Sequence, residues 1–69
     1  MNKDIESILS MISFVKNQLG NDAWLSIDDQ NQVVLWESYK GDAGIVAKWN
    51  VDPKGRKSLV DAKLINEFA

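Results

Sequence analysis

The side chains of this chain that could do chemistry are carboxylates, lysines and hydroxyls, because the sequence contains neither His nor Cys. The commonest general base, the commonest zinc ligand and the thiolate nucleophile are therefore missing together. Among the carboxylates, Asp28 and Asp29 are adjacent. Neighbouring side chains of a strand point to opposite faces, so the two do not form a catalytic dyad, and we interpret them as turn residues.

Two further patterns lack the context that a ligand site requires. Asp22, Asp28, Asp29 and Asp42 do not have the spacing of a calcium-binding loop. Gly41-Asp42-Ala43-Gly44 is not followed by the helix that a phosphate-binding loop requires. The sequence thus predicts no catalytic residue, no metal site and no cofactor, and we expect a protein that is not an enzyme.

Length and composition indicate one small domain, residues 1–69, with a net charge of −2. No apolar run approaches the roughly 20 residues that cross a bilayer, and the first residues do not have the basic start and apolar centre of a signal peptide. We expect a cytoplasmic protein of the type found among small bacterial or phage regulators. A core of this size leaves about 3–5 kcal/mol of net stability, so self-association would add useful burial.

The first element expected is an amphipathic helix from Asp4 to Leu19. Its apolar residues recur at steps of three and four, which places them on one face: Ile5, Ile8, Ile12, Val15 and Leu19. Met11 and Phe14 lie beside this stripe. They either widen the buried face or belong to an exposed apolar patch that meets a partner.

Three strands follow, because the chain alternates between apolar and polar residues from Ala23 to Asp28 and in the two runs around Val33–Glu37 and Ile45–Val51. A first turn centred on Gln30 and Asn31 sets Ile27 opposite Val34 and Leu25 opposite Trp36. A second turn centred on Asp42 and Ala43 gives these opposed pairs: Trp36 with Trp49, Ser38 with Ala47, Tyr39 with Val46 and Glu37 with Lys48.

This register predicts a core face and an opposite face of the sheet. The core face contains Leu25, Ile27, Val34, Trp36, Ile45, Ala47, Trp49 and Val51. The opposite face contains Trp24, Ser26, Val33, Leu35, Glu37, Tyr39, Val46, Lys48 and Asn50.

The end of the chain allows two interpretations. Asp52-Pro53-Lys54-Gly55 has the composition of a turn, and Ser58 is placed to cap a closing helix from about Leu59 to Glu67. The alternative is a fourth strand at Lys57 to Val60 before a shorter helix. We predict an α+β fold of order α-β-β-β-α, a two-layer sandwich of a three-stranded antiparallel meander with both helices on the face that carries Trp36 and Trp49.

The length and order of these elements resemble the double-stranded-RNA-binding domain. In that family a basic stretch at the start of the last helix grips phosphates, and the resemblance implies this role for Lys54, Arg56 and Lys57. The family's glycine-and-lysine signature is missing, acidic residues dilute the cluster, and the overall charge does not attract nucleic acid. Nucleic-acid binding is therefore the alternative function.

The function that we favour is a non-enzymatic protein-interaction module with a regulatory, accessory or inhibitory role. Apolar and aromatic residues on the opposite face would make its binding surface: Trp24, Val33, Leu35, Tyr39 and Val46. The same residue types are ordinary on exposed strands. A third interpretation is that this face meets a second copy of the chain in a two-fold homodimer.

Overall fold

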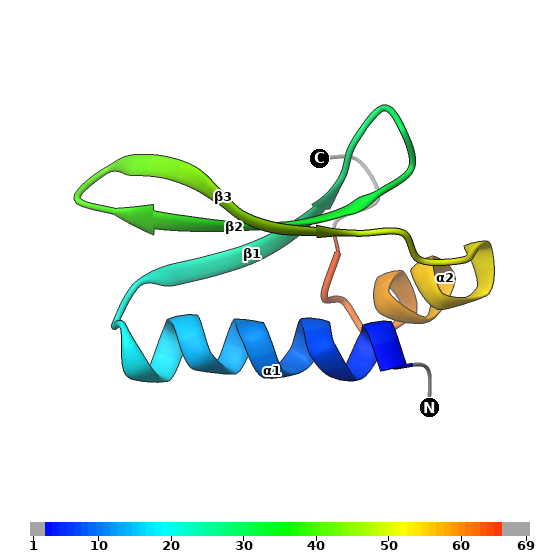
Figure 1. The fold of residues 1–69 in the computed structure, drawn as a ribbon, viewed down its shortest axis with the longest axis horizontal. Coiled ribbons are helices and arrows are strands. Elements are labelled where there is room, and N and C mark those ends of the chain that lie inside the picture. Colours follow the sequence, from blue (N-terminus) through cyan, green and yellow to red (C-terminus); the bar gives the residue numbers. More distant parts are fainter. Residues whose placement is uncertain (1–2, 66–69) are drawn as a thin grey trace.

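The computed structural model describes residues 3–65 and has the predicted order of elements. Helix α1 (Lys3–Gln18) leads into strands β1 (Asp22–Ile27), β2 (Val33–Tyr39) and β3 (Asp42–Trp49), and helix α2 (Pro53–Asp61) follows. The strands form an antiparallel meander in the order β1-β2-β3 (Figure 1). The predicted α+β fold is confirmed.

Both helices lie on the same side of the sheet. Helix α1 runs beneath β1 and β2, and α2 lies beyond the end of the strands next to the start of α1 (Figure 1). The core between these layers contains buried residues from every element except β3, together with Val51 before α2 and Ile65 after it. Its buried members are Ile8, Val15, Ala23, Leu25, Val33, Leu35, Val51, Leu59 and Ile65. The third strand adds the half-buried Val46 and Trp49.

Helix α1 matches the predicted helix within one residue at each end. Ile8 and Val15 are buried against the sheet, whereas Leu19, after the last turn, is 54% exposed. Met11 and Phe14 are 37% and 52% exposed. These two side chains therefore do not widen the buried face, and the contact of this exposed patch with a partner stays a prediction.

The register predicted for the first hairpin is wrong by one residue. Trp24 lies opposite Trp36, and Leu25 lies opposite Leu35. The loop has three residues instead of two, since Asp28 and Gln32 close it and Asn31 takes a left-handed conformation with φ 60°. A shift of one residue exchanges the faces of a strand, so Val33 and Leu35 face the helices, and Val34 and Trp36 point to the other side. Val34 is nevertheless buried there, with 1% of its surface exposed.

The second hairpin turns earlier than predicted, at Lys40-Gly41 instead of Asp42-Ala43. Both turn residues have positive φ, 53° and 88°, which is the backbone of the type I′ turns that suit the twist of paired strands. The pairs are consequently Tyr39 with Asp42, Ser38 with Ala43, Glu37 with Gly44 and Trp36 with Ile45, and a β-bulge shifts the register before Leu35 meets Ala47. The predicted pairs of Trp36 with Trp49 and of Glu37 with Lys48 are wrong.

The faces of the sheet change accordingly. Trp49 packs on the helix side as predicted, together with Leu25, Ile27 and Val51, whereas Trp36 lies on the side away from the helices.

The closing helix begins at Pro53, six residues before the predicted start. Asp52 is its N-cap, with Oδ1 accepting a hydrogen bond of 2.6 Å from the Gly55 amide, and Pro53 is pre-organised for the first helical position. The stretch interpreted as a turn is therefore a helix start. The alternative of a fourth strand at Lys57 to Val60 is wrong, because these residues lie inside α2.

Beyond α2 the chain returns to the sheet. Lys63 takes a left-handed conformation with φ 60°, and the Leu64 amide donates to the Leu59 carbonyl, which ends the helix. Ile65 then forms a parallel bridge with Leu25 on the outer edge of β1. The last part of the predicted helix, up to Glu67, lies outside the described residues.

The Lys40-Gly41 turn predicts that replacing Gly41 by Ala changes the stability of the fold differently from replacing Gly44, although both glycines have open surroundings. A Cβ at Gly41 or Gly44 would meet nothing within 4 Å, but only Gly41 has positive φ. We expect Gly41→Ala to lower the free energy of unfolding by about 1 kcal/mol and Gly44→Ala to leave it unchanged or raise it slightly. Urea denaturation followed by Trp fluorescence measures both, and equal stability of the two variants would contradict the turn at Lys40-Gly41.

Gly55 is predicted to be intolerant of a side chain because α2 packs closely at this point. A Cβ there would lie 2.5 Å from Cγ1 of the buried Val51 and 3.1 Å from Oδ1 of Asp52. Although Ala favours a helix by about 1 kcal/mol over Gly, the clash should outweigh this, so that Gly55→Ala destabilises the fold by about 1–2 kcal/mol. Ser58→Ala, at an exposed position of the same helix, is the matched control. An increase in the midpoint of thermal unfolding for Gly55→Ala would show that the contact is absent.

Candidate functional site

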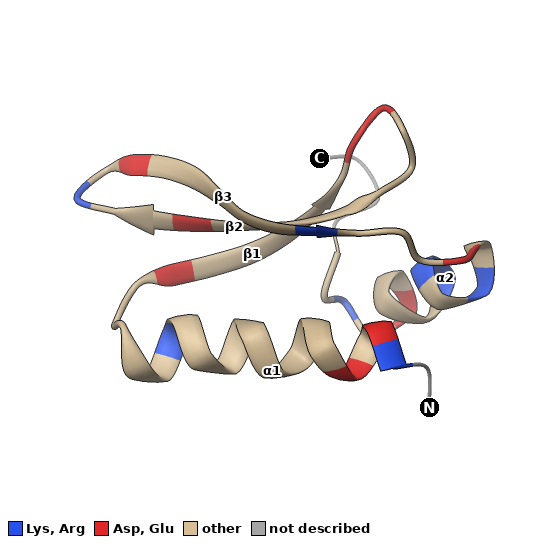
Figure 2. Ribbon diagram, in the orientation of Figure 1, with Lys and Arg blue, Asp and Glu red and all other residues tan. Residues whose placement is uncertain are grey.

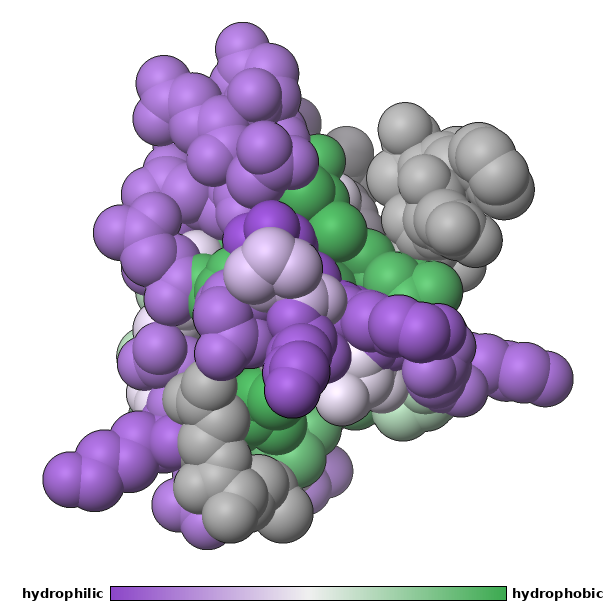
Figure 3. All heavy atoms as spheres, turned by 90° about the vertical axis from the view of Figure 1, so that its right-hand side faces the viewer, coloured by the Kyte–Doolittle hydropathy of each residue, from purple (hydrophilic) through white to green (hydrophobic). Residues whose placement is uncertain are grey.

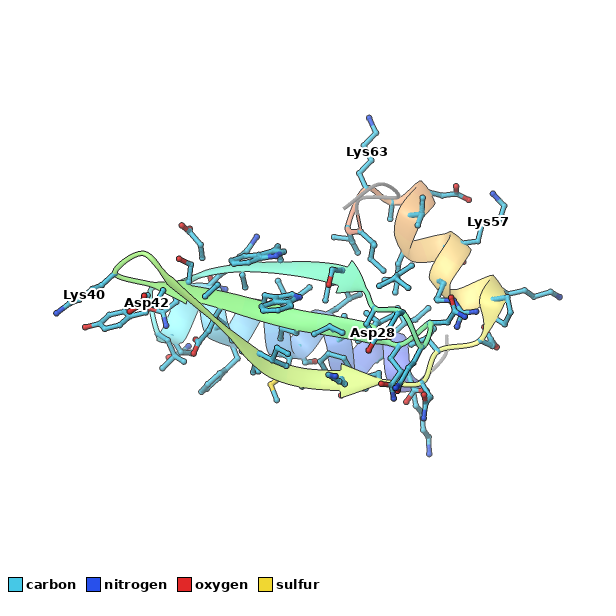
Figure 4. The ribbon with its side chains drawn as sticks, turned by 90° about the horizontal axis from the view of Figure 1, so that it is seen from above. Asp28, Lys40, Asp42, Lys57 and Lys63 are labelled. Carbon is cyan, nitrogen blue, oxygen red and sulfur yellow. The ribbon has the colours of Figure 1, made fainter. Side chains whose placement is uncertain are left out.

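The side of the sheet away from α1 carries the surface that we call the open face: Trp24, Ser26, Trp36 and Ile45. These residues alternate with the buried Leu25, Val33 and Leu35 or lie opposite one another across the strands. Trp24 is 41% exposed and Ile45 is 52% exposed. Neither helix covers this side of the sheet, which faces the viewer in Figure 4.

Two parallel indole rings form the centre of the open face. Trp24 and Trp36 are directly opposed in the β1–β2 pair, with ring centroids 6.3 Å apart and planes 4° from parallel. Trp36 Nε1 donates a hydrogen bond of 2.8 Å to Ser26 Oγ, which fixes the orientation of that ring. Trp24 Nε1 has no acceptor among the described residues, so its N–H is available to a ligand. The result is an aromatic surface held by two strands and one side-chain hydrogen bond.

Asp28 borders the open face at the first hairpin loop. Its Oδ1 accepts hydrogen bonds of 2.9 Å from the amides of both Gln30 and Gln32, and its Oδ2 lies 3.7 Å from Lys48 Nζ. The Gln32 amide lowers the pKa of the Asp28 carboxyl most, and the Gln30 amide and the charge of Lys48 act in the same direction against an opposing desolvation. Asp28 is thus a structural turn residue, as the sequence indicated.

The structure does not gather the five residues that the sequence assigned to a protein-binding surface. Trp24 lies on the open face, but Val33 and Leu35 are fully buried beneath the sheet and Val46 packs against the core. Tyr39 is 58% exposed at the far end of the second hairpin, where Lys40 Nζ lies 5.3 Å from its ring centroid. The one-residue change in register exchanges the faces of β2 and so separates these side chains.

Sequence reasoning missed Trp36 and Ile45, which the structure places beside Trp24. A usable signal was present in Lys40-Gly41: a Gly at the second central position of a two-residue turn fits the type I′ hairpin. Centring the hairpin there sets Trp36 opposite Ile45, as observed.

The three basic residues of the alternative function lie in the first two turns of α2 (Figure 2). Arg56 is engaged within the fold, because its Nη1 donates to the backbone carbonyls of Asn31, at 3.0 Å, and Val51. Lys57 pairs with Asp61 at 3.2 Å one turn later. Lys54 and Lys57 are exposed, and Lys57 extends away from the sheet (Figure 4). Arg56 is therefore held within the fold and Lys57 is shared with Asp61, which leaves Lys54 as the residue of the three with no polar partner among the described residues.

A shallow apolar groove separates α1 from α2. Its volume is about 470 Å³, and it is lined by Ile5, Leu9, Asp52, Lys54, Gly55, Ser58, Leu59, Ala62 and Leu64. Figure 3 shows hydrophobic residues exposed between hydrophilic ones at this end of the molecule.

Within residues 3–65, no three acidic side chains come together as a group that could hold a metal ion. In the same part of the chain, neither helix has the length and hydrophobicity needed to span a membrane.

Comparisons with protein-family models, with curated proteins and with solved structures found no match for this chain.

The hydrogen bonds of Asp28 predict a pH-dependent contribution to stability. Since folding lowers its pKa below the ordinary value of 3.8, the charged carboxylate stabilises the fold above that value, and this stabilisation is lost as the pH falls through the folded pKa. Wild type should therefore be more stable than Asp28→Asn near neutral pH, with the difference shrinking well below pH 3.8. Urea denaturation at a series of pH values measures it, and a difference independent of pH would contradict the role of the charge.

Proposed function

We propose that this chain is a small protein-interaction module that binds a partner protein through the open face. The observation that carries the proposal is the parallel Trp24–Trp36 pair on a side of the sheet that neither helix covers. Large aromatic surfaces in contact with water are costly unless a partner covers them, and Trp is the residue most enriched among binding hot spots.

The construction of the pair supports tight contact with a partner. Both rings stand on paired strands, and the Ser26 hydrogen bond holds Trp36 before any partner arrives. Little side-chain entropy is then lost on binding, which leaves more of the contact energy for affinity. The Trp24 N–H, which has no acceptor among residues 3–65, adds a donor that can select a carbonyl or carboxylate of the partner.

The rest of the surface fits an apolar contact with a polar border. Ile45 extends the open face toward β3, and the Asp28–Lys48 ion pair lies at its edge with no net charge. Such an arrangement, apolar at the centre and polar around it, is that of ordinary protein interfaces. The proposal covers a regulatory, accessory or inhibitory role without catalysis, in the cytoplasm of a bacterium or in a phage-infected cell.

A second candidate function rests on the exposed lysines of α2. Lys54, Lys57 and Lys63 carry positive charge on the outer side of this helix and its end. A phosphate backbone could contact them, as the resemblance to the double-stranded-RNA-binding domain implies, although Arg56 is held within the fold. We place this function second because Lys57 is paired with Asp61 and the carboxylate of Asp52 caps the same helix.

The proposed function predicts that Trp24→Ala abolishes capture of the partner. Wild-type protein used as bait in extracts of its native host should retain a specific protein, and the Kd of that complex should weaken at least tenfold, by about 1.4 kcal/mol or more, for Trp24→Ala. Leu19→Ser, at an exposed apolar position just after α1, should bind like wild type.

Circular dichroism of each bait verifies that the fold is intact. Equal capture by wild type and Trp24→Ala would disprove the role of the open face. Retardation of duplex RNA by wild type at low salt, lost in a Lys54→Glu/Lys57→Glu variant, would establish the second function instead.

A further inference from the structure

The groove between α1 and α2 has the size and lining of a site for a small apolar molecule. Its volume of about 470 Å³ falls within the range of about 300–1,000 Å³ that such sites occupy. Its apolar side chains are all aliphatic: Ile5 and Leu9 from α1, Leu59 from α2, and Ala62 and Leu64 from the segment after α2. None of the lining residues is aromatic, so the walls offer no ring on which a flat ligand could stack. They fit a flexible hydrocarbon chain instead.

The groove has an apolar floor where α2 passes close to α1. A Cβ at Gly55 would lie 3.5 Å from Cδ1 of Ile5, and the buried Leu59 continues the same side of α2 one turn later. Ile5 and Leu9 are only half-buried, so part of their apolar surface is still in contact with water. A hydrocarbon chain that lay against this floor would remove the surface from water, which is favourable.

The polar groups of the groove come from the start and middle of α2, and two of the three have partners within the fold. Asp52 Oδ1 accepts the hydrogen bond of 2.6 Å from the Gly55 amide, and Ser58 Oγ donates one of 3.0 Å to the Lys54 carbonyl. The ammonium of Lys54 is exposed and has no polar partner within residues 3–65. Lys54 therefore provides the charge that remains available to a ligand.

The carboxylate of Asp52 does not cancel the preference of this end for an anion. Asp52 is the N-cap of α2, where backbone amides and the positive end of the helix dipole compensate its negative charge. The ammonium of Lys54 has no such compensation among the described residues. The groove thus combines an aliphatic bed with one available cation near the start of α2.

We propose that the groove binds a free fatty acid of medium chain length. Its carboxylate lies beside Lys54, and its hydrocarbon chain runs along α2 toward Leu64. Both helices lie on the side of the sheet opposite the open face, so this site is separate from the surface of the proposed function. Because the ligand has few atoms and the groove is shallow, we expect weak binding, with Kd about 10⁻⁴–10⁻³ M.

Titration of the isotope-labelled chain with decanoate, followed by heteronuclear NMR, tests the proposal. Decanoate below its micelle concentration should shift the amide signals of Gly55, Leu59 and Leu64 in a saturable way. Decanol has the same chain without the charge and should bind about threefold more weakly or worse. Each CH₂ added between octanoate and dodecanoate should tighten binding about twofold to fourfold, since complete burial of one CH₂ corresponds to about fourfold.

Three exposed positions separate the head group from the chain. Lys54→Gln should reduce the affinity for decanoate to that for decanol and leave decanol binding unchanged. Leu64→Ser removes part of the aliphatic wall and should weaken both ligands about threefold or more. Lys63→Gln is the matched control, because Lys63 is an exposed cation that does not line the groove, and it should bind both ligands like wild type.

Four results would overturn the proposal. They are the absence of a saturable shift with decanoate at up to about 5 mM, equal affinities of wild type for decanoate and decanol, and equal binding by wild type and Leu64→Ser. The fourth is a shift of the same amides with protein concentration alone, which would show that a second copy of the chain fills the groove.

The open face provides the control that keeps this test apart from the proposed function. Trp24→Ala should bind decanoate like wild type, because Trp24 does not line the groove. Capture of the partner protein should likewise be unchanged in Leu64→Ser. Shifts confined to the indole N–H signals of Trp24 and Trp36 would place the fatty acid on the open face and would also overturn the proposal.

Discussion

The register of β1 against β2 depends on the loop that Asp28 holds closed. Its carboxylate accepts two backbone amides, and Asn31 adopts a left-handed conformation, so the hairpin contains three loop residues. That number decides which side chains of β2 face α1. A two-residue loop would turn Trp36 toward the core and leave Leu35 exposed, because every side chain of a strand changes face with a shift of one residue.

A single long helix is the second constraint, since a 16-residue helix about 10 Å wide cannot cover three strands. Helix α1 lies under β1 and β2, and its apolar stripe, centred on Ile8 and Val15, meets Leu25 and Leu35 there. The open face and the outer part of β3 are left without a covering layer. Both surfaces are exposed for the same reason: the chain is too short to form a further layer over them, which is typical of a small domain.

The end of the molecule next to α2 is closed by polar contacts as well as by apolar packing. Asp52 caps the helix, and Arg56 donates to backbone carbonyls in two separate connections, at Asn31 and Val51. Leu59 supplies the buried contact of this helix with the core. A guanidinium that satisfies carbonyls within the fold is less available to phosphates, which weakens the analogy with a nucleic-acid-binding helix.

The sequence by itself determined the number, order and type of the elements, because periodicities of 3.6 and 2 are properties of the chain alone. It also identified Leu25 as core and Asp28 as a turn residue. Only the tertiary structure decided which face of β2 is buried, since Val33-Val34-Leu35-Trp36 is apolar on both faces and supports either register equally well. The turn backbone at Asn31 and Lys40 settled that choice, and with it the exposure of Trp36 on the surface from which we infer function.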